Sequence, residues 1–341
     1  MDSLQFAVVR QEIAFGLPYT YARGHDLTCT VVRVELREKS REKSREGAHL
    51  GRGEGAPFES FFEVSAEETV AELEEIGPLV ESGTADRADL LSRLRHGAAR
   101  NALDAALWDL AAKRAGVPVW RLLGTPEPRP LEIMTTISLA DPEQLEQEIA
   151  ESRSVRILKL KLGSPDADDD VHRLERLRAA RPDARIVVDV NGGWDLDTLR
   201  VMLPLLEKHR VRMLEQPVDA ASEPGLRGLP RTLPIVADES FETEDDLERV
   251  RGLYDGVNVK LDKCGGLTAA LRIIGRARRE GLRIMVGCLP GSSLSAAVGF
   301  HAAQLAEFVD LDGHLRLVDD VEPRMPAKDG RLQAPARELW G

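Results

Sequence analysis

The chain has 341 residues, enough for roughly two domains or for one barrel with an added lobe. Hydrophobic residues make up 43% of it and charged residues 30%, which is typical of a globular protein and argues against a mainly disordered one. The formal net charge is −12 and the pI is near 5.2, so the protein is negatively charged at neutral pH. Because this charge repels phosphate backbones and anionic lipids, we expect neither nucleic acid nor a membrane surface as a partner.

Cysteine spacing and hydropathy predict a cytoplasmic protein. Cys29, Cys264 and Cys288 show no C-x-x-C pattern, which argues against a disulfide framework and against a zinc site. No apolar run reaches the roughly 18 residues of a membrane helix, and the first residues lack the basic and apolar segments of an export signal.

The first third of the chain is predicted to mix strands with helices. Strand-like runs cover residues 4–15 and 28–36, and the Gly- and Pro-containing segment between them, GLPYTYARGHD, is expected to form a surface loop. The mixed charges of REKSREKSRE at 37–46 predict a solvated hairpin tip. Amphipathic helices are expected over 66–80 and 97–115, the second closed by Gly116. Strands followed by helices suggest an α+β lobe.

After residue 130 the pattern changes to eight short apolar runs separated by helical stretches. This alternation is typical of a barrel of parallel strands wrapped by helices, with the active site at the carboxyl ends of the strands. A doubly wound sheet is the competing fold, but the G-x-G-x-x-G turn expected after its first strand is missing. The runs are LEIMTTI, RILKLKL, RIVVDV, VRMLEQ, PIVADES, GVNVKL, RIMVGC and EFVDL, and the helices are expected at 142–152, 171–180, 196–208, 245–251, 267–280 and 293–305.

Three carboxylates end three successive runs: Asp189, Glu215 and Asp238. In a parallel barrel these ends meet at one mouth, where close acidic groups repel one another unless a cation neutralises them. An all-oxygen set suits a hard divalent ion, and we expect these residues to bind one Mg²⁺. The alternative is that each carboxylate separately caps the helix that follows it.

Lysines precede and follow these carboxylates in the chain. Lys159 and Lys161 lie two residues apart and share one face of their strand, which we expect to be the barrel interior. Like charge and burial should lower their pKa towards neutrality, as a general base requires. Lys260 lies about halfway around the barrel, and one base on each side of the substrate would allow stereochemical inversion. Its alternative role is as a structural partner of Asp238.

Eight motifs occur in order along the chain: GRGEGAP, ARNALDAALWDLAAKRAG, LKLKLG, VDVNGGW, LEQP, ADES, VNVKLDKCGGLT and MVGCLP. They resemble those of the enolase superfamily, and within it the muconate-lactonising branch that includes the dipeptide epimerases. The resemblance implies an α/β fold, a (β/α)₇β modified TIM barrel with an α+β capping domain. It also implies that Asp189, Glu215 and Asp238 bind Mg²⁺ and that Lys161 and Lys260 are the acid/base catalysts. Lys159 would support them, and Asn191 and Glu239 would lie around the metal.

Further positions resemble the substrate-binding residues of the dipeptide epimerases. The last strand ends FVDLDGHL, and the resemblance implies that Asp310 and Asp312 hold the free ammonium group of a dipeptide. Arg23 resembles the arginine that holds a glutamate side chain in alanyl-glutamate epimerases, and Thr136 matches a pocket position. The turn GCLPGS at 287–292 departs from the family pattern, in a loop that contacts substrate.

The sequence therefore predicts a Mg²⁺-dependent dipeptide epimerase, with L-Ala-D/L-Glu from murein as substrate and two-base proton transfer through an enediolate. A cycloisomerase or syn-dehydratase of the same superfamily is the alternative. Two alternatives from other functional classes are a Schiff-base aldolase and a non-catalytic binding protein. We expect a capping domain over 1–125 with the tail 318–341 packed on it, a barrel over 126–317, and a symmetric homo-oligomer.

Overall fold

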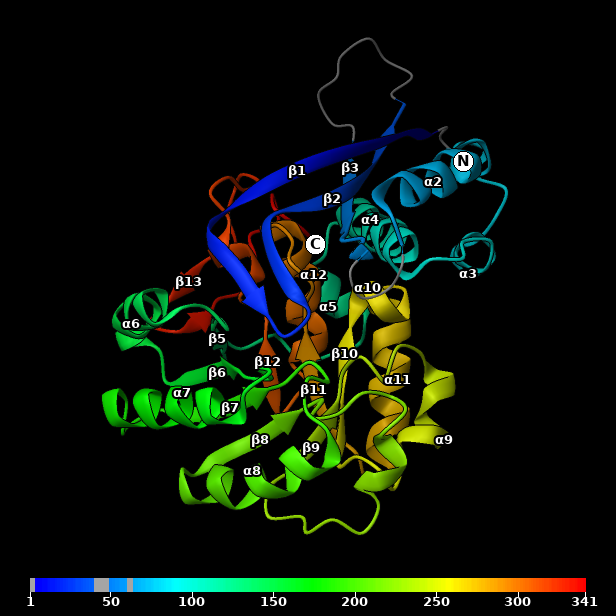
Figure 1. Ribbon diagram of the computed structural model, residues 1–341. Coiled ribbons are helices and arrows are strands. Elements are labelled where there is room, and N and C mark those ends of the chain that lie inside the picture. The colour runs from blue at the N-terminus through cyan, green and yellow to red at the C-terminus, as the bar shows by residue number, and fades with distance from the viewer. Residues whose placement is uncertain (1–3, 40–48, 60–63) are drawn as a thin grey trace.

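The computed structural model describes residues 4–39, 49–59 and 64–341. Its first part is a three-stranded antiparallel sheet with helices packed against it (Figure 1). Helix α4 begins and ends where the sequence predicts, and Gly116 adopts the left-handed conformation that ends it. The elements are β1 (Leu4–Tyr21), β2 (Gly24–Glu38), β3 (Leu50–Gly55), α2 (Ala66–Ser82), α3 (Arg87–Ser92), α4 (Gly97–Ala115) and α5 (Val119–Leu122).

The predicted surface loop at residues 16–26 is wrong, because β1 and β2 continue through it as a hairpin. Tyr19 pairs with Asp26, Tyr21 pairs with Gly24, and a register shift between Ala14 and Tyr19 accommodates the glycine and proline of this segment. The Tyr21 hydroxyl donates to Asp26 Oδ2 at 2.9 Å across the two strands. Most of the charged repeat predicted as a hairpin tip, from residue 40 to 46, lies outside the described residues.

The seam between β3 and α4 is built from the smallest residues. Gly51, Gly53 and Gly55 alternate along β3, and a Cβ atom on Gly53 would lie 2.1 Å from the carbonyl oxygen of Ala102 in α4. The backbone of the strand therefore approaches the alanine-rich face of the helix more closely than any side chain would allow.

Eight parallel strands then form the barrel, in sequence order from β5 to β12, and β12 also contacts β5 so that the sheet nearly closes. All eight predicted strands are present, and the predicted modified TIM barrel with a capping region is confirmed. The strands are β5 (Met134–Ile137), β6 (Ile157–Lys161), β7 (Arg185–Asp189), β8 (Val211–Glu215), β9 (Ile235–Ala237), β10 (Gly256–Lys260), β11 (Arg283–Gly287) and β12 (Phe308–Asp310).

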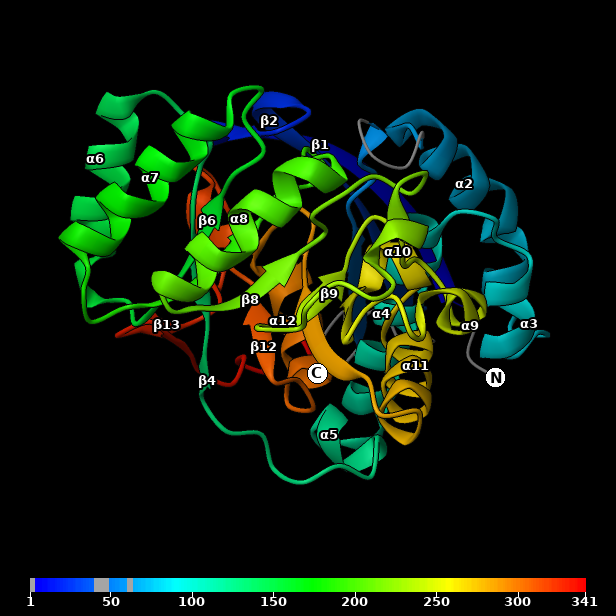
Figure 2. The ribbon, with the colours of Figure 1, turned by 60° about the horizontal axis from the view of Figure 1, so that its bottom comes forward.

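Helices lie around the outside of the strands (Figure 2). Asp141 and Asp166 cap two of them, and the second cap starts its helix four residues earlier than predicted. The segment predicted as a helix at 245–251 is instead a 3₁₀ turn followed by one short helix. The helices are α6 (Pro142–Glu151), α7 (Ala167–Ala180), α8 (Leu196–Lys208), α9 (Leu247–Val250), α10 (Leu261–Cys264), α11 (Leu267–Arg279) and α12 (Ser293–Ala303), with 3₁₀ turns η1 (Ser152–Ser154), η2 (Glu223–Leu226), η3 (Glu244–Asp246) and η4 (Gly313–Arg316).

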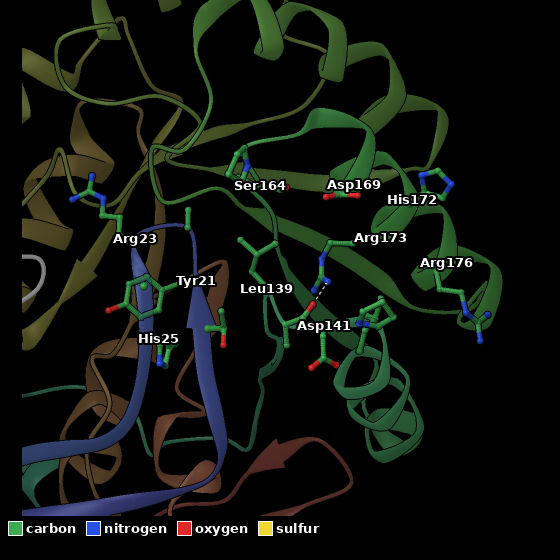
Figure 3. Close-up of a pocket in the computed structure, with 18 of the residues that line it drawn as sticks. Tyr21, Arg23, His25, Leu139, Asp141, Ser164, Asp169, His172, Arg173 and Arg176 are labelled. Atoms are coloured by element: carbon green, nitrogen blue, oxygen red, sulfur yellow. Dashed lines mark hydrogen bonds between the residues drawn. The ribbon is translucent and has the colours of Figure 1, made fainter.

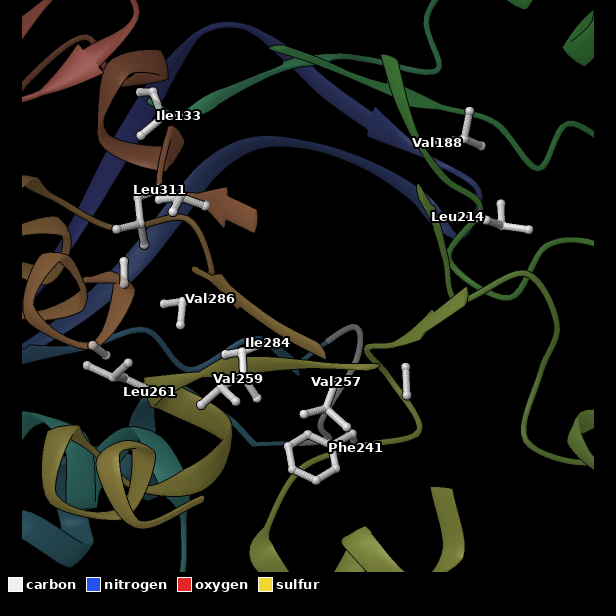
Figure 4. Close-up of a cluster of buried hydrophobic side chains, with 14 of the residues drawn as sticks. Ile133, Val188, Leu214, Phe241, Val257, Val259, Leu261, Ile284, Val286 and Leu311 are labelled. Carbon is white, nitrogen blue, oxygen red and sulfur yellow. The ribbon is translucent and has the colours of Figure 1, made fainter. Parts of the chain in front are cut away.

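Strand periodicity divides the barrel residues into an outer and an inner set. Outward residues such as Val188, Leu214 and Val257 join the large core beneath the helices (Figure 4). Inward residues form an apolar layer of Met134, Val187, Met213, Val236 and Met285. The next inward residue on most strands is charged or polar, so the catalytic layer lies directly above an apolar floor.

The C-terminal segment packs back on the capping region. Trp340 Nε1 donates to the carbonyl oxygen of Ala105 at 3.1 Å, and the Gly341 amide donates to Asp109 Oδ1 at 2.7 Å. Before it, β13 (Ala327–Lys328) and β14 (Arg331–Leu332) form a small sheet with β4 (Leu131–Glu132). Among the described residues, no helix has the length and apolar character needed to cross a membrane.

Candidate active site

The three predicted carboxylates meet at the mouth of the barrel. Lys161 and Asp189 are register partners on β6 and β7, and Asp189 and Glu215 are partners on β7 and β8. Asp189, Glu215 and Asp238 are fully buried, and each offers an oxygen atom within 4.8 Å of the others. The structure therefore brings together the predicted set, on three neighbouring strands.

The donor set fits a hard divalent cation. All three groups supply carboxylate oxygens, the ligands that Mg²⁺ prefers, and the strands hold them on one side of the mouth. Burial and the negative charge of Asp189 raise the pKa of Glu215 to about 8, so negative charge is crowded at this position. A cation placed here would remove that crowding, which makes these three residues the candidate metal ligands.

Lys159 lies at the centre of the charged layer. Its Nζ is 2.9 Å from Asp189 Oδ2, 2.8 Å from Glu215 Oε2 and 2.6 Å from Asp310 Oδ2. Burial raises the pKa of Asp189, but the charges of Lys159 and Lys161 outweigh it and lower that pKa to about 2. Lys159 thus joins the carboxylates on one side of the mouth to Asp310 on the other.

Lys161 and Lys260 approach the carboxylates from different strands. The Nζ of Lys161 donates to Asp189 Oδ2 at 2.7 Å and to Asn191 Oδ1 at 2.9 Å. The Nζ of Lys260 donates to Asp238 Oδ2 at 2.7 Å, so the alternative role of Lys260 as a partner of Asp238 is present in this structure. Both lysines line the same two small cavities at the mouth.

The expectation of lowered lysine pKa values is wrong for this arrangement. Burial does favour the neutral amines, but Asp189 beside Lys161 and Asp238 beside Lys260 outweigh it, so both pKa values are raised. The pKa of Lys159 is raised for the same reason, chiefly by Asp189 against burial. The carboxylates that face these lysines from other strands affect their pKa values more strongly than the like charge of the neighbouring lysines does.

Asn191 and Glu239 lie beside the carboxylates, as predicted. The Asn191 Nδ2 donates to Glu239 Oε1 at 2.9 Å, and the Asn191 amide donates to Asp189 Oδ1 at 3.0 Å. Burial and the charge of Asp238 raise the pKa of Glu239. Asn191 therefore links Lys161, Asp189 and Glu239 in one hydrogen-bond network.

Two residues of the site were missed in the sequence. Lys263 is buried, and its Nζ donates to the Asp238 carbonyl oxygen at 2.6 Å and to Asp238 Oδ1 at 2.7 Å. Asn258 Nδ2 donates to Glu215 Oε1 at 2.7 Å. Asn258 had a usable signal, because it lies two residues before Lys260 and so shares its inward face. Lys263 had none, since it follows the strand on the short helix α10.

The acidic pair at the last strand lies opposite the metal candidates. Asp310 is held by Lys159, and its Oδ1 has no hydrogen-bond partner among the described residues. Asp312 Oδ2 accepts from the Thr136 amide at 2.8 Å. The structure thus brings Thr136, Asp310 and Asp312 together as predicted, and all three line the cavity that contains Lys161 and Lys260.

Arg23 lies at the tip of the β1–β2 hairpin. Its Nε donates to the Asn191 carbonyl oxygen at 3.3 Å, which places the guanidinium against the loop that follows Asp189. The tip packs tightly, because a Cβ atom on Gly163 would lie 3.0 Å from that of Ala22, and Gly163 has a φ of +99°. Arg23 lines neither of the two cavities that contain Lys161 and Lys260, so this structure places it at the edge of the site and not among the other predicted residues.

Two cavities of about 30 Å³ each lie beneath the hairpin, between Tyr19, the lysines and Pro290. They are far smaller than the roughly 300 Å³ of a small-molecule site, so the site is closed in this structure. Cys288 lines both cavities, and burial raises the pKa of its thiol, which suits packing and not nucleophilic attack.

A larger cavity of about 930 Å³ lies on the outer side of the hairpin tip (Figure 3). Among the candidate site residues, all of which the structure describes, only Arg23 lines it. Figure 3 shows Arg173 directed into this cavity and Arg23 directed away from it. Volume alone therefore does not locate the chemistry, and the charged layer does.

Comparison with known proteins gives the same placement. The family described as Enolase C-terminal domain-like matches residues 142–338, and the Mandelate racemase / muconate lactonizing enzyme N-terminal domain matches residues 65–124. The chain is 35% identical to the L-Ala-D/L-Glu epimerase of Escherichia coli K12 over 317 residues, covering 92% of this chain and 95% of that protein.

Two solved structures are similar over nearly the whole chain. An enolase family member from Agrobacterium tumefaciens with homology to dipeptide epimerases, bound to sodium and L-Ala-L-Glu, is 36% identical with a TM-score of 0.91, covering 99% of this chain and all of that one. A dipeptide epimerase from Methylococcus capsulatus, complexed with Mg and L-Arg-D-Lys, is 31% identical with a TM-score of 0.89, covering 100% and 99%. On the fold, the charged layer and these matches together, the chain belongs to the enolase superfamily, in its mandelate racemase / muconate lactonizing enzyme group.

Proposed function

We propose that this protein is a Mg²⁺-dependent dipeptide epimerase of the L-Ala-D/L-Glu type, an isomerase. The observation that carries the proposal is the placement of Lys161 and Lys260 on different strands around one cavity beside three buried carboxylates. Inversion at a carbon atom requires an acid and a base on opposite sides of it, and these two lysines are the candidates. The similar proteins named as dipeptide epimerases support the same class.

In the proposed mechanism, one lysine removes the proton from the α-carbon of the second residue and the other returns a proton to the opposite face. Asp189, Glu215 and Asp238 would hold the metal ion. Its positive charge would stabilise the negative charge that increases on the substrate carboxylate when the proton is removed. Lys159 places further positive charge between these ligands and Asp310. Asn191 and Glu239 keep Lys161 and the ligands in position.

Removing a proton requires one lysine to be neutral, although both pKa values are raised here. Asp189 and Asp238 cause that rise, and they are also proposed metal ligands. Positive charge bound to them would reduce their hold on Lys161 and Lys260, so each lysine could release its proton more readily.

The substrate assignment rests on three positions. Asp310 and Asp312 would accept the ammonium group of the first residue, and the unpartnered Asp310 Oδ1 is placed to do so. Arg23 would bind the side-chain carboxylate of a glutamate in the second position. Thr136, beside Asp312, completes the pocket.

Solvent-proton exchange tests the function. With L-Ala-L-Glu and Mg²⁺ in D₂O, one deuterium should enter the α-carbon of the second residue, and EDTA should abolish the incorporation. Lys161→Met and Lys260→Met should each abolish inversion, and each variant should still exchange the proton of one epimer, the one that faces the remaining lysine. Absence of exchange with a broad dipeptide panel would refute the proposal, and ring closure or loss of water with another acid would then indicate a cycloisomerase or dehydratase.

We further infer the setting of the enzyme. L-Ala-D-Glu occurs in murein peptides, so the reaction would serve peptidoglycan recycling in the cytoplasm. A capping domain over 1–125 with the tail 318–341, a barrel over 126–317 and a symmetric homo-oligomer would fit this family. Limited proteolysis and light scattering test these inferences.

A further inference from the structure

A second cavity lies behind Asp312. Its volume is about 320 Å³, and it lies on the outer side of β5, towards Val155 and Leu315. The catalytic cavity and this one share three lining residues: Thr136, Asp312 and Arg316. The wall between the two cavities is therefore made of these side chains, at the end of the site where the first residue of a substrate would lie.

Arg316, the last residue of η4, is the largest part of this wall, and it is held firmly. Its guanidinium donates to the carbonyl oxygen of Thr136, and Nη1 donates to Ser138 Oγ at 3.2 Å. Glu148 Oε1 lies 3.6 Å from Nη1 and Asp312 Oδ2 lies 3.9 Å from Nε. The side chain is 15% exposed, so it is a fixed partition and not a mobile lid.

The hairpin holds the other side of the same group. The guanidinium carbon of Arg316 lies 5.3 Å from the centre of the Tyr19 ring, and Lys161 Nζ lies 5.8 Å from that centre. Arg316 thus occupies the space between the hairpin, β5 and Asp312. With the substrate ammonium at Asp310 and Asp312, a chain extended at its amino end towards the second cavity would meet this guanidinium.

We propose that Arg316 determines substrate length, closing the amino end of the site so that only a dipeptide with a free amino terminus fits. The inference rests on the proposed function, because it places the substrate ammonium at Asp310 and Asp312. A volume of about 320 Å³ is at the lower end of small-molecule sites, so the second cavity has room for one more residue once the partition is removed.

The test compares L-Ala-L-Glu with Gly-L-Ala-L-Glu, by deuterium incorporation at the glutamate α-carbon in D₂O with Mg²⁺. The measured quantity is the ratio of kcat/KM for the tripeptide to kcat/KM for the dipeptide. Arg316→Ala should raise this ratio roughly tenfold or more, mainly through a lower KM for the tripeptide. Arg316→Met keeps the bulk without the charge and should leave the ratio within about twofold of wild type. Arg324→Ala, at a side chain that is 56% exposed, is the control.

Refilling the cavity should reverse the effect. A Cβ atom on Gly16 would meet a single neighbour within 4 Å, the Arg316 carbonyl oxygen at 3.7 Å, and Gly16 lines the second cavity, so Gly16→Leu is the variant chosen to fill it. In the Arg316→Ala background it should return the ratio towards the wild-type value. If R316A does not fold because Glu148 loses its cation, R316A/E148Q removes the unpaired charge and carries the same expectation.

The outcomes separate the two proposals. Exchange of the dipeptide by wild type with an unchanged ratio in folded R316A would overturn the role of Arg316 alone. A ratio raised equally by R316M would do the same, because charge and not bulk would then be responsible. Absence of exchange with any dipeptide by wild type would instead refute the proposed function.

Discussion

Replacing Lys263 by methionine should destabilise the metal-free protein and alter its response to Mg²⁺. Lys263 is buried, and its Nζ makes two short hydrogen bonds to Asp238, one to the carbonyl oxygen and one to Oδ1. Methionine has a similar length and fills the same space, so the change removes charge and hydrogen bonds with little loss of packing. Asp238 would then keep Lys260 as its neighbouring cation.

Breaking a buried ion pair costs about 3–5 kcal/mol when the remaining charge has no other cation, and Lys260 beside Asp238 places this change at the lower end, about 3 kcal/mol. If the chain unfolds as one unit, an unfolding entropy of about 2.1 cal/mol/K per residue means that each kcal/mol shifts Tm by roughly 1.4 °C at this length. Lys263→Met should therefore lower Tm by about 4 °C in EDTA. Mg²⁺ should reduce the difference in Tm between the wild type and Lys263→Met, because a divalent ion beside Asp238 would replace part of the missing positive charge.

Circular dichroism melts in EDTA and in Mg²⁺ measure both effects. Lys208→Met, at an exposed position of α8, is the matched control and should melt with the wild type in both buffers. A Tm for Lys263→Met within about 1 °C of wild type in EDTA would refute the claim that Asp238 depends on this lysine. A gap that Mg²⁺ leaves unchanged would contradict the assignment of Asp238 as a ligand.

Three further results are expected. Burial lowers the pKa of His301 and of His314 to about 4. Between pH 6.5 and 4 these histidines are therefore protonated in the unfolded chain and neutral in the folded chain. The free energy of unfolding should therefore be highest above pH 6.5 and should fall by about 3 kcal/mol per histidine as the pH is lowered to 4. Urea unfolding at several pH values will measure this fall, and replacing either histidine by glutamine should make it smaller. Arg23→Met should raise KM for L-Ala-L-Glu roughly tenfold and leave that for L-Ala-L-Leu nearly unchanged, and an equal change for both would contradict its role in side-chain recognition. Gly53→Ala places a methyl group 2.1 Å from the Ala102 carbonyl oxygen, so the variant should express poorly or melt well below wild type, and an unchanged Tm would contradict the tight seam.

The barrel and its charged layer could be predicted because they depend on local pattern. Each strand is an apolar run that ends in a polar residue, and parallel strands bring such ends together wherever they occur. Asp189 and Glu215 became neighbours through strand register alone. Helix limits were also local where a cap specified them, as at Asp141 and Gly116.

Features that depend on packing could not be predicted. The segment 16–26 contains residues typical of loops, yet it is paired because the hairpin lies over the barrel. The pKa of Lys161 depends on carboxylates from other strands, and the direction expected from its own strand was wrong. Arg316 looks like an ordinary arginine in the sequence, and only the fold places it between two cavities.

If substrate enters by movement of the β1–β2 hairpin, the pairing of its strands determines which residues move together. Its strands are paired to Tyr21 and Gly24 at the turn, and the register shifts between Ala14 and Tyr19. Bending at that irregular stretch would move Tyr19, Tyr21 and Arg23 together as one rigid unit. The binding positions of both substrate residues would then be exposed in one step. Dipeptides with different side chains would then dissociate with the same activation enthalpy, because bending of the β1–β2 hairpin would determine it and the contacts of each dipeptide would not.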